Sequence, residues 1–171
     1  MKKLFDITIN HVRISDPCYD KSSWGCINIP NCKIGKWVAE IEKEGNRVSV
    51  LKAMLFDHDE HSLKWKKFKE KISVDSGQAG IYDDRYYKDD KIIPDNFSFE
   101  YNFNGKKENL SAKNWYGLNC CKTLDDNGWG IIPFGCVSST GYGDGDYPVY
   151  YQIDEDLQEM VALKIVYIFS S

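Results

Sequence analysis

The stretch 161-VALKIVYIF-169 decides the fold class. Its odd-numbered residues are all apolar, and Lys164 is the only charged residue among the even-numbered ones. A short segment that is apolar on both faces and rich in β-branched and aromatic side chains is typical of a strand with neighbours on both sides. We therefore predict a central, buried strand over residues 161–169.

A β-hairpin is predicted further upstream. Residues 36–41 place Trp37, Ala39 and Ile41 on one face, the turn 44-EGN-46 follows, and residues 48–56 are apolar on both faces. A short loop containing glycine between two such runs is the usual signal for a hairpin. A second hairpin is expected around 154-DED-156, between a strand at 149–153 and the strand at 161–169.

The remaining pattern is also mostly that of strands. Further strands are expected at 4–9, 12–14, 71–74, 79–82, 97–103 and 129–137, and the only helices expected are short ones at 61–71 and 113–124, with a turn near 85–88. Strands that recur at short intervals with Gly, Asn and Asp between them indicate a sandwich or barrel. We predict a mainly β, single-domain antiparallel sandwich or barrel over residues 1–171, with one or two short helices.

Composition limits the partners. The chain has 171 residues, 42% of them hydrophobic and 14% aromatic, which is ample material for a core. Its net charge of −4 argues against a nucleic-acid partner, because such proteins usually carry an excess of Lys and Arg. The basic stretch 64-KWKKFKEK-71 is interpreted as a short helix packed on the sheet, with its lysines in solvent.

The N-terminus and the cysteines favour a cytoplasmic protein. Asp6 and Asn10 interrupt the apolar run that a signal peptide needs, and no stretch is long and apolar enough for a membrane span. The six cysteines are expected to be reduced, because disulfide frameworks belong mainly to exported chains. They show no C-x-x-C pair typical of a zinc site; they are Cys18, Cys26, Cys32, Cys120, Cys121 and Cys136.

Three segments are the candidates for a functional site: 14-ISDPCY-19, 74-VDSGQAGIYDD-84 and 138-SSTGYGDGDYPVY-150. Each is expected to be the end of a strand that leads into a turn rich in Gly, Asp and small hydroxyl residues. Such turns leave backbone amides and carboxylates free for a ligand while a rigid sheet holds them in place.

Together these segments resemble an uncharacterised family of bacterial proteins known only as a domain of unknown function. The resemblance rests on Asp16-Pro17, on the Val-Asp-x-Gly motif at 74–77 that continues to Asp83, and on 143-GDGDYPVY-150. It spans most of the chain and implies a shared fold. It implies no activity, substrate or catalytic residue.

Individual residues allow more than one interpretation. Asp144 and Asp146 are oxygen ligands suited to Ca²⁺ or Mg²⁺, or they bond to their own turn. Asp75 caps a turn, or meets Asp83 and Asp144 in a carboxylate cluster. Three further ligand-binding or catalytic candidates complete the set: Asp16, Cys18 and Gln78.

Two function classes remain open at this point. The first is a binding or interaction module that recognises a small ligand, a cation or a protein through its Asp- and Gly-rich loops. The second is a hydrolase-like enzyme that uses the carboxylates, with or without a divalent cation. The first is favoured because no complete catalytic constellation is visible: Cys18 would need a base, and only His11, His58 and His61 could supply one.

Overall fold

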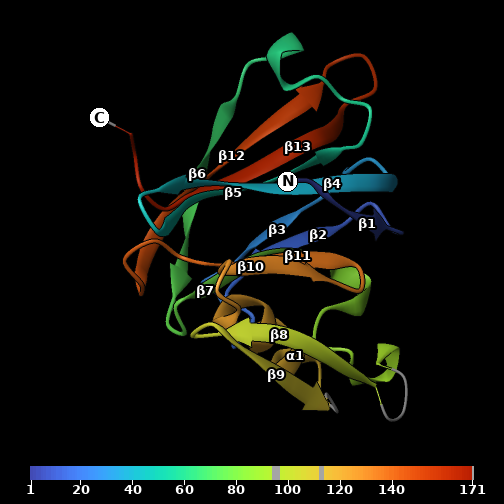
Figure 1. Cartoon of the computed structure of the whole chain (residues 1–171). Helices are drawn as coiled ribbons and strands as arrows, with labels where there is room; N and C mark the ends of the chain where they lie inside the picture. The colour runs from blue at the N-terminus through green and yellow to red at the C-terminus, as the bar shows by residue number, and fades with distance from the viewer. Residues whose placement is uncertain (94–96, 112–113, 171) are drawn as a thin grey trace.

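Two antiparallel sheets face each other and enclose the main core (Figure 1). The computed structural model describes residues 1–93, 97–111 and 114–170. The first sheet has six strands, which are, from edge to edge, β1 (Lys3–Ile7), β4 (Gly35–Glu44), β5 (Arg47–Leu55), β13 (Glu159–Val166), β12 (Gly145–Asp154) and β6 (Lys66–Val74).

The second sheet has five strands and carries an outer layer. Its order is β10 (Trp129–Ile132), β11 (Gly135–Ser139), β7 (Gln78–Asp83), β2 (Val12–Ser15) and β3 (Ile27–Ile29). A separate hairpin of β8 (Ser98–Phe103) and β9 (Lys106–Ser111) and the helix α1 (Trp115–Leu124) lie on the side away from the first sheet (Figure 1). Short 3-10 helices occur at Glu60–Ser62, Asp84–Tyr86 and Asp90–Ile92.

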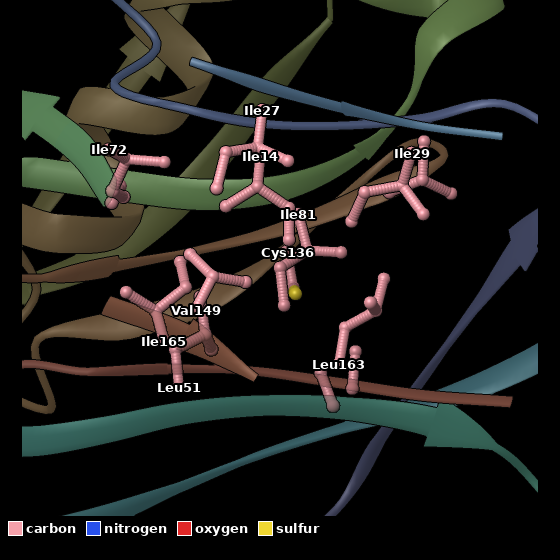
Figure 2. Close-up of a cluster of buried hydrophobic side chains, with 14 of the residues drawn as sticks. Ile14, Ile27, Ile29, Leu51, Ile72, Ile81, Cys136, Val149, Leu163 and Ile165 are labelled. Atoms are coloured by element: carbon pink, nitrogen blue, oxygen red, sulfur yellow. The ribbon is translucent and has the colours of Figure 1, made fainter. Parts of the chain in front are cut away.

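The core between the two sheets consists of aliphatic side chains from both inner faces (Figure 2). Ile14 and Ile81 of the five-stranded sheet meet Leu51, Leu163 and Ile165 of the six-stranded sheet, and all five are fully buried. Burial of this apolar surface is the main force that holds the sheets together. The predicted mainly β, antiparallel fold is confirmed in its sandwich form; in the described part of the chain neither sheet closes into a barrel.

A second, more aromatic cluster joins the five-stranded sheet to α1. Trp115 packs edge-on against Tyr82 and Tyr87, with ring centroids 5.0 and 4.8 Å away. Tyr82 also lies across Gly80, where an added Cβ would overlap its ring and the carbonyl oxygen of Cys136. Only glycine fits at this position of β7.

The strand predicted from 161-VALKIVYIF-169 is central, as expected. β13 pairs with β5 on one side and β12 on the other, although it ends at Val166 and Phe169 is exposed. The predicted hairpins are also present: β4 and β5 turn at Gly45, whose φ of +61° suits glycine, and β12 and β13 turn after Asp154. The helix expected at 113–124 is confirmed as α1 from Trp115 onwards; residue 113 lies outside the described residues.

The helix predicted at 61–71 is wrong. Only a 3-10 turn at Glu60–Ser62 is helical, and β6 follows it at the edge of the six-stranded sheet. Phe68 packs on Tyr151 of β12, with ring centroids 4.5 Å apart. The lysines of β6 are exposed along this edge strand, where charged side chains hinder pairing with another chain.

Two smaller corrections concern strand boundaries. The single strand predicted at 129–137 is the hairpin β10–β11, because Pro133 and Phe134 form a turn and Phe134 stacks on Tyr86 with centroids 3.9 Å apart. The strand predicted at 97–103 is β8, and its partner β9 was not predicted. No helix in the described part of the chain is long and apolar enough to cross a membrane.

Candidate functional site

Asp16 is a buried carboxylate at the end of β2 that binds the corner where β6 leads into β7. Its Oδ2 accepts the backbone N–H groups of Asp75 and Ser76 at 2.8 and 2.7 Å, and its Oδ1 accepts the Ser76 hydroxyl at 2.6 Å and the N–H of Cys18 at 2.8 Å. Asp16 is 0% exposed. Its four hydrogen bonds compensate the cost of burying the charge, so its role is to hold two loops together.

The third segment joins the same corner. The N–H of Gly77 donates to Oδ1 of Asp144 at 2.9 Å, and the Ser73 hydroxyl donates to Oδ1 of Asp146 at 2.8 Å. β12 and β6 pair directly here, with Gly145 opposite Val74. The structure therefore brings together the three segments that the sequence singled out.

An open groove with a volume of about 640 Å³ lies over this corner. We call it the corner groove and define it by six residues of its lining: Tyr19, Trp24, Ser73, Asp75, Asp144 and Asp146. One wall is the loop between β2 and β3, and the other is the paired ends of β6 and β12. The Ser73 N–H donates to the carbonyl of Gly25 at 3.0 Å, which fixes the loop against β6.

The three carboxylates of the corner groove are exposed, and each has one hydrogen bond to the protein. Oδ2 of Asp75 accepts the Tyr19 hydroxyl at 2.9 Å, while Asp144 and Asp146 are bound through Oδ1 as described. These bonds orient the side chains and leave the other oxygen of each free to accept from a ligand. Among the described residues that line the groove, none is basic.

Two aromatic residues complete the corner groove. Burial, and then the hydrogen bond to Asp75, raise the pKa of Tyr19, so its hydroxyl stays protonated and acts as a donor. Trp24 is 91% exposed. Trp24 thus presents an exposed aromatic ring beside the acidic residues of the groove.

Cys18 and Gln78 lie next to this corner but have internal partners. Burial raises the pKa of the Cys18 thiol to about 12, and the hydrogen bond and the charge of Asp16 add to the effect. The thiol is therefore protonated at neutral pH, whereas a nucleophile must be a thiolate. Gln78 is buried, and its side chain contacts Ser76, Tyr116, Cys120 and Thr123 of neighbouring segments.

Asp83 does not join the predicted cluster. It lies at the far end of β7, roughly 17 Å from Gln78 along an extended strand. Its Oδ2 accepts the N–H and hydroxyl of Thr8 at 2.7 and 2.6 Å, and its Oδ1 accepts the N–H of Arg85. The expectation that Asp83 meets Asp75 and Asp144 is corrected: Asp83 anchors the loop after β1 instead.

The carboxylates at the corner form a small set of oxygen donors for a metal ion. Asp144 and Asp146 lie on the same side of the groove, but the described residues contain no group of three or more His, Cys, Asp or Glu side chains placed to hold a metal ion. Ca²⁺ takes six to eight oxygen ligands and Mg²⁺ six. A cation here would need most of its ligands from backbone carbonyls and water.

Residues 33–165 match the family described as "Protein of unknown function (DUF4241)". The chain belongs to the DUF4241 family. No curated protein and no solved structure matches it.

The DUF4241 match covers one part of the site and not the other. It runs from just before β4 to the end of β13, so it includes Asp75, Asp144 and Asp146. The loop that carries Asp16, Tyr19 and Trp24 precedes the matched residues. The resemblance drawn from the motifs at 74–83 and 143–150 thus agrees with the DUF4241 match.

Sequence reasoning missed Trp24 and Ser73 as parts of this site, and it included Tyr19 only as the last residue of the candidate segment 14-ISDPCY-19. The segment 22-SSWG-25 contains a signal that Trp24 is exposed. Its neighbours in the sequence are small residues, which offer little apolar surface against which a tryptophan can be buried. Nothing in the sequence pairs Ser73 with Asp146, which is 73 residues away.

Proposed function

We propose that this chain is a binding module whose corner groove takes a positively charged organic group, the ammonium or guanidinium of a small ligand or of a protein side chain. The observation that carries the proposal is the combination of three exposed carboxylates with an exposed tryptophan in one groove. A ligand with such a group can pair with the carboxylates and stack on the ring.

Charge supports the choice of a cationic ligand. Asp75, Asp144 and Asp146 line one concave surface without a basic side chain among the described lining residues. Like charges in one groove raise the local concentration of cations and favour an incoming opposite charge. A guanidinium carries five N–H donors in a planar fork, so it can donate to the free oxygen of Asp144 and to that of Asp146.

The aromatic residues support an organic cation in particular. A cation over the face of tryptophan gains about 0.5–1 kcal/mol at exposed sites, and tryptophan is the most favourable of the aromatic residues. Trp24 and the ring of Tyr19 also offer apolar contact to the stem of a lysine or arginine. A bare metal ion would gain nothing from either ring's apolar surface.

A hydrolase-like activity has less support. The thiol nearest the corner, Cys18, has a pKa raised to about 12 and is a poor nucleophile at neutral pH. Asp16 is saturated by four internal donors, so it has no free oxygen for a substrate. The carboxylates that remain are exposed and suited to binding.

We also propose that the protein is bacterial and cytoplasmic. The bacterial origin is what the resemblance of its motifs implies. All six cysteines are free, which suits a reducing compartment.

The test is calorimetric titration of a capped tri-arginine peptide into the protein at physiological salt, with the tri-citrulline peptide as the uncharged control. We expect the arginine peptide to bind and the citrulline peptide to bind at least tenfold more weakly. Asp144→Asn and Trp24→Ala should each weaken binding at least fivefold. Asp156→Asn, which changes the same charge in the exposed turn after β12, should not.

Divalent cations form the second part of the same titration. The proposal expects Ca²⁺ and Mg²⁺ to bind no more tightly than the arginine peptide and without dependence on Trp24. Equal loss of arginine-peptide binding in Asp144→Asn and Asp156→Asn would mean general attraction to an acidic protein, and would refute a specific site in the groove.

A further inference from the structure

A second groove, at the β10 edge of the five-stranded sheet, has different chemistry. It has a volume of about 450 Å³ and lies between β1, the start of β8, α1 and the β10–β11 hairpin. We call it the apolar groove and define it by six residues of its lining: Leu4, Phe5, Phe97, Phe99, Leu118 and Lys122. A volume of this size with apolar walls and few polar groups is usual for small-molecule sites.

Lys122 of α1 is the basic residue inside the apolar groove. Its stem crosses Gly130 of β10, where an added Cβ would come within 2.8 Å of Cδ. Its Nζ lies 4.9 Å from the centroid of the Phe99 ring. The glycine therefore allows the stem of the lysine to lie against the sheet, with its ammonium beside the Phe99 ring.

The charge of Lys122 is poorly compensated. Among the described residues, no carboxylate lies within ion-pair distance of its Nζ. Burial lowers its pKa, and the charge of Lys3 lowers it further. An ammonium held in an apolar groove favours an anion that arrives there.

Two acids near the groove have other partners: Asp6, which lines it, and Asp125, whose charge acts on Lys122. Asp6 pairs with Lys36 at 3.1 Å. Asp125 accepts the N–H groups of Asn102 and Asn127, each at 2.9 Å. In the described residues, neither carboxylate forms an ion pair with Lys122, which leaves its ammonium available to an anion that enters the groove.

We propose that the apolar groove binds a small amphipathic carboxylate, a molecule with a single carboxylate and an aliphatic or aromatic body. The carboxylate pairs with Lys122, and the body lies against Leu4, Phe97 and Phe99. This site is separate from the corner groove and does not depend on the function proposed for it, because the two grooves share no lining residue.

Decanoate is the probe and 1-decanol is its uncharged control, with binding followed by displacement of the fluorescent anion anilinonaphthalene sulfonate and by calorimetry. We expect decanoate to bind at least tenfold more tightly than decanol. Lys122→Met keeps the stem across Gly130 but removes the charge, so it should weaken decanoate to the level of decanol and leave decanol unchanged. Lys107→Met, in the exposed part of β9, should change neither.

A second variant, at an exposed residue, keeps the test decisive if Lys122→Met fails to fold. Leu4 is 51% exposed at the mouth of the groove, so Leu4→Glu should fold and should repel decanoate, whereas Leu4→Gln should bind it. The proposal is overturned if decanol binds as tightly as decanoate, if neither binds, or if Lys122→Met and Leu4→Glu both leave decanoate binding intact.

Discussion

Ser76 donates two hydrogen bonds to Asp16, one from its backbone amide at 2.7 Å and one from its hydroxyl at 2.6 Å. The two residues are 60 positions apart, and Asp16 is fully buried. This pair fixes the loop after β2 against the corner between β6 and β7. It thereby holds the loop that forms one wall of the corner groove, although neither residue lines the groove itself.

Asp16→Asn should therefore destabilise the protein. The asparagine NH₂ replaces one acceptor oxygen and faces backbone N–H or hydroxyl donors, so at least one buried donor loses its partner. Hydrogen bonds to charged groups contribute about 1.5–3 kcal/mol each, and we expect a loss of about 2–4 kcal/mol in the free energy of unfolding. Urea denaturation at pH 7 measures it. A loss below about 1 kcal/mol, as is usual for an exposed cap such as Asp144→Asn, would contradict this role.

The cysteines should all be thiols. All six are free in the structure, and three of them are buried. Titration with a thiol reagent in denaturant, without a reductant, should find six reactive groups. In the native protein Cys18, Cys32 and Cys136 should react slowly, because the pKa of each is raised to about 12. Four or fewer groups in denaturant, with the rest restored by reduction, would show disulfides.

Stability should fall in alkaline solution. Burial raises the pKa of Cys32 from 9.0 to about 12, so between these values the unfolded thiol loses its proton while the folded one keeps it. The free energy of unfolding then decreases by about 1.4 kcal/mol per pH unit for such a group. Urea denaturation from pH 8 to 10.5 should show the decline, and it should be shallower in Cys32→Ala. Equal slopes in the two proteins would contradict the assignment.

Acid sensitivity should depend on Lys52, a buried lysine on β5. Its Nζ lies 2.7 Å from Glu60 and 3.0 Å from Glu40. Burial alone would raise the pKa of Glu60, but the hydrogen bond and charge of Lys52 lower it below the usual 4.5. The stabilisation is thus present at neutral pH and lost as the pH falls through the folded-state pKa.

Glu60→Gln should accordingly reduce the free energy of unfolding more at pH 7 than at pH 3.5. Glu70→Gln, which removes an exposed carboxylate of β6, serves as the control and should give the same small change at both values. If the cost of Glu60→Gln were independent of pH, the ion pair would not be its cause.

The sequence correctly predicted the central strands, because a strand that is buried on both faces has apolar residues at successive positions. The residues of β13 and β5 are apolar on both faces, and both strands are central. β6 was mistaken for a helix because Trp65 and Phe68 are three residues apart. In the structure Phe68 packs across the sheet on Tyr151 of β12. These two residues are 83 positions apart, so no local pattern predicts their contact.

The candidate site was predicted only in part, because its contacts also join residues that are far apart in the sequence. Motif composition identified the three turns, and they do meet. It could not distinguish Asp16, whose two oxygens both accept hydrogen bonds from the protein, from Asp144, which keeps a free oxygen. It also could not place Asp83, because only the length of β7 shows that it lies at the opposite end of the strand.

The most direct test of the corner groove is an NMR titration of the isotope-labelled protein with the capped tri-arginine peptide. We expect saturable shifts of the backbone amides of Gly77, Asp144 and Gly145 and of the Trp24 indole N–H, with little change in the β12–β13 turn or at Lys122. The tri-citrulline peptide should leave these signals in place. Shifts spread over all acidic surfaces, or none at the groove when the peptide is in large excess, would contradict the central claim.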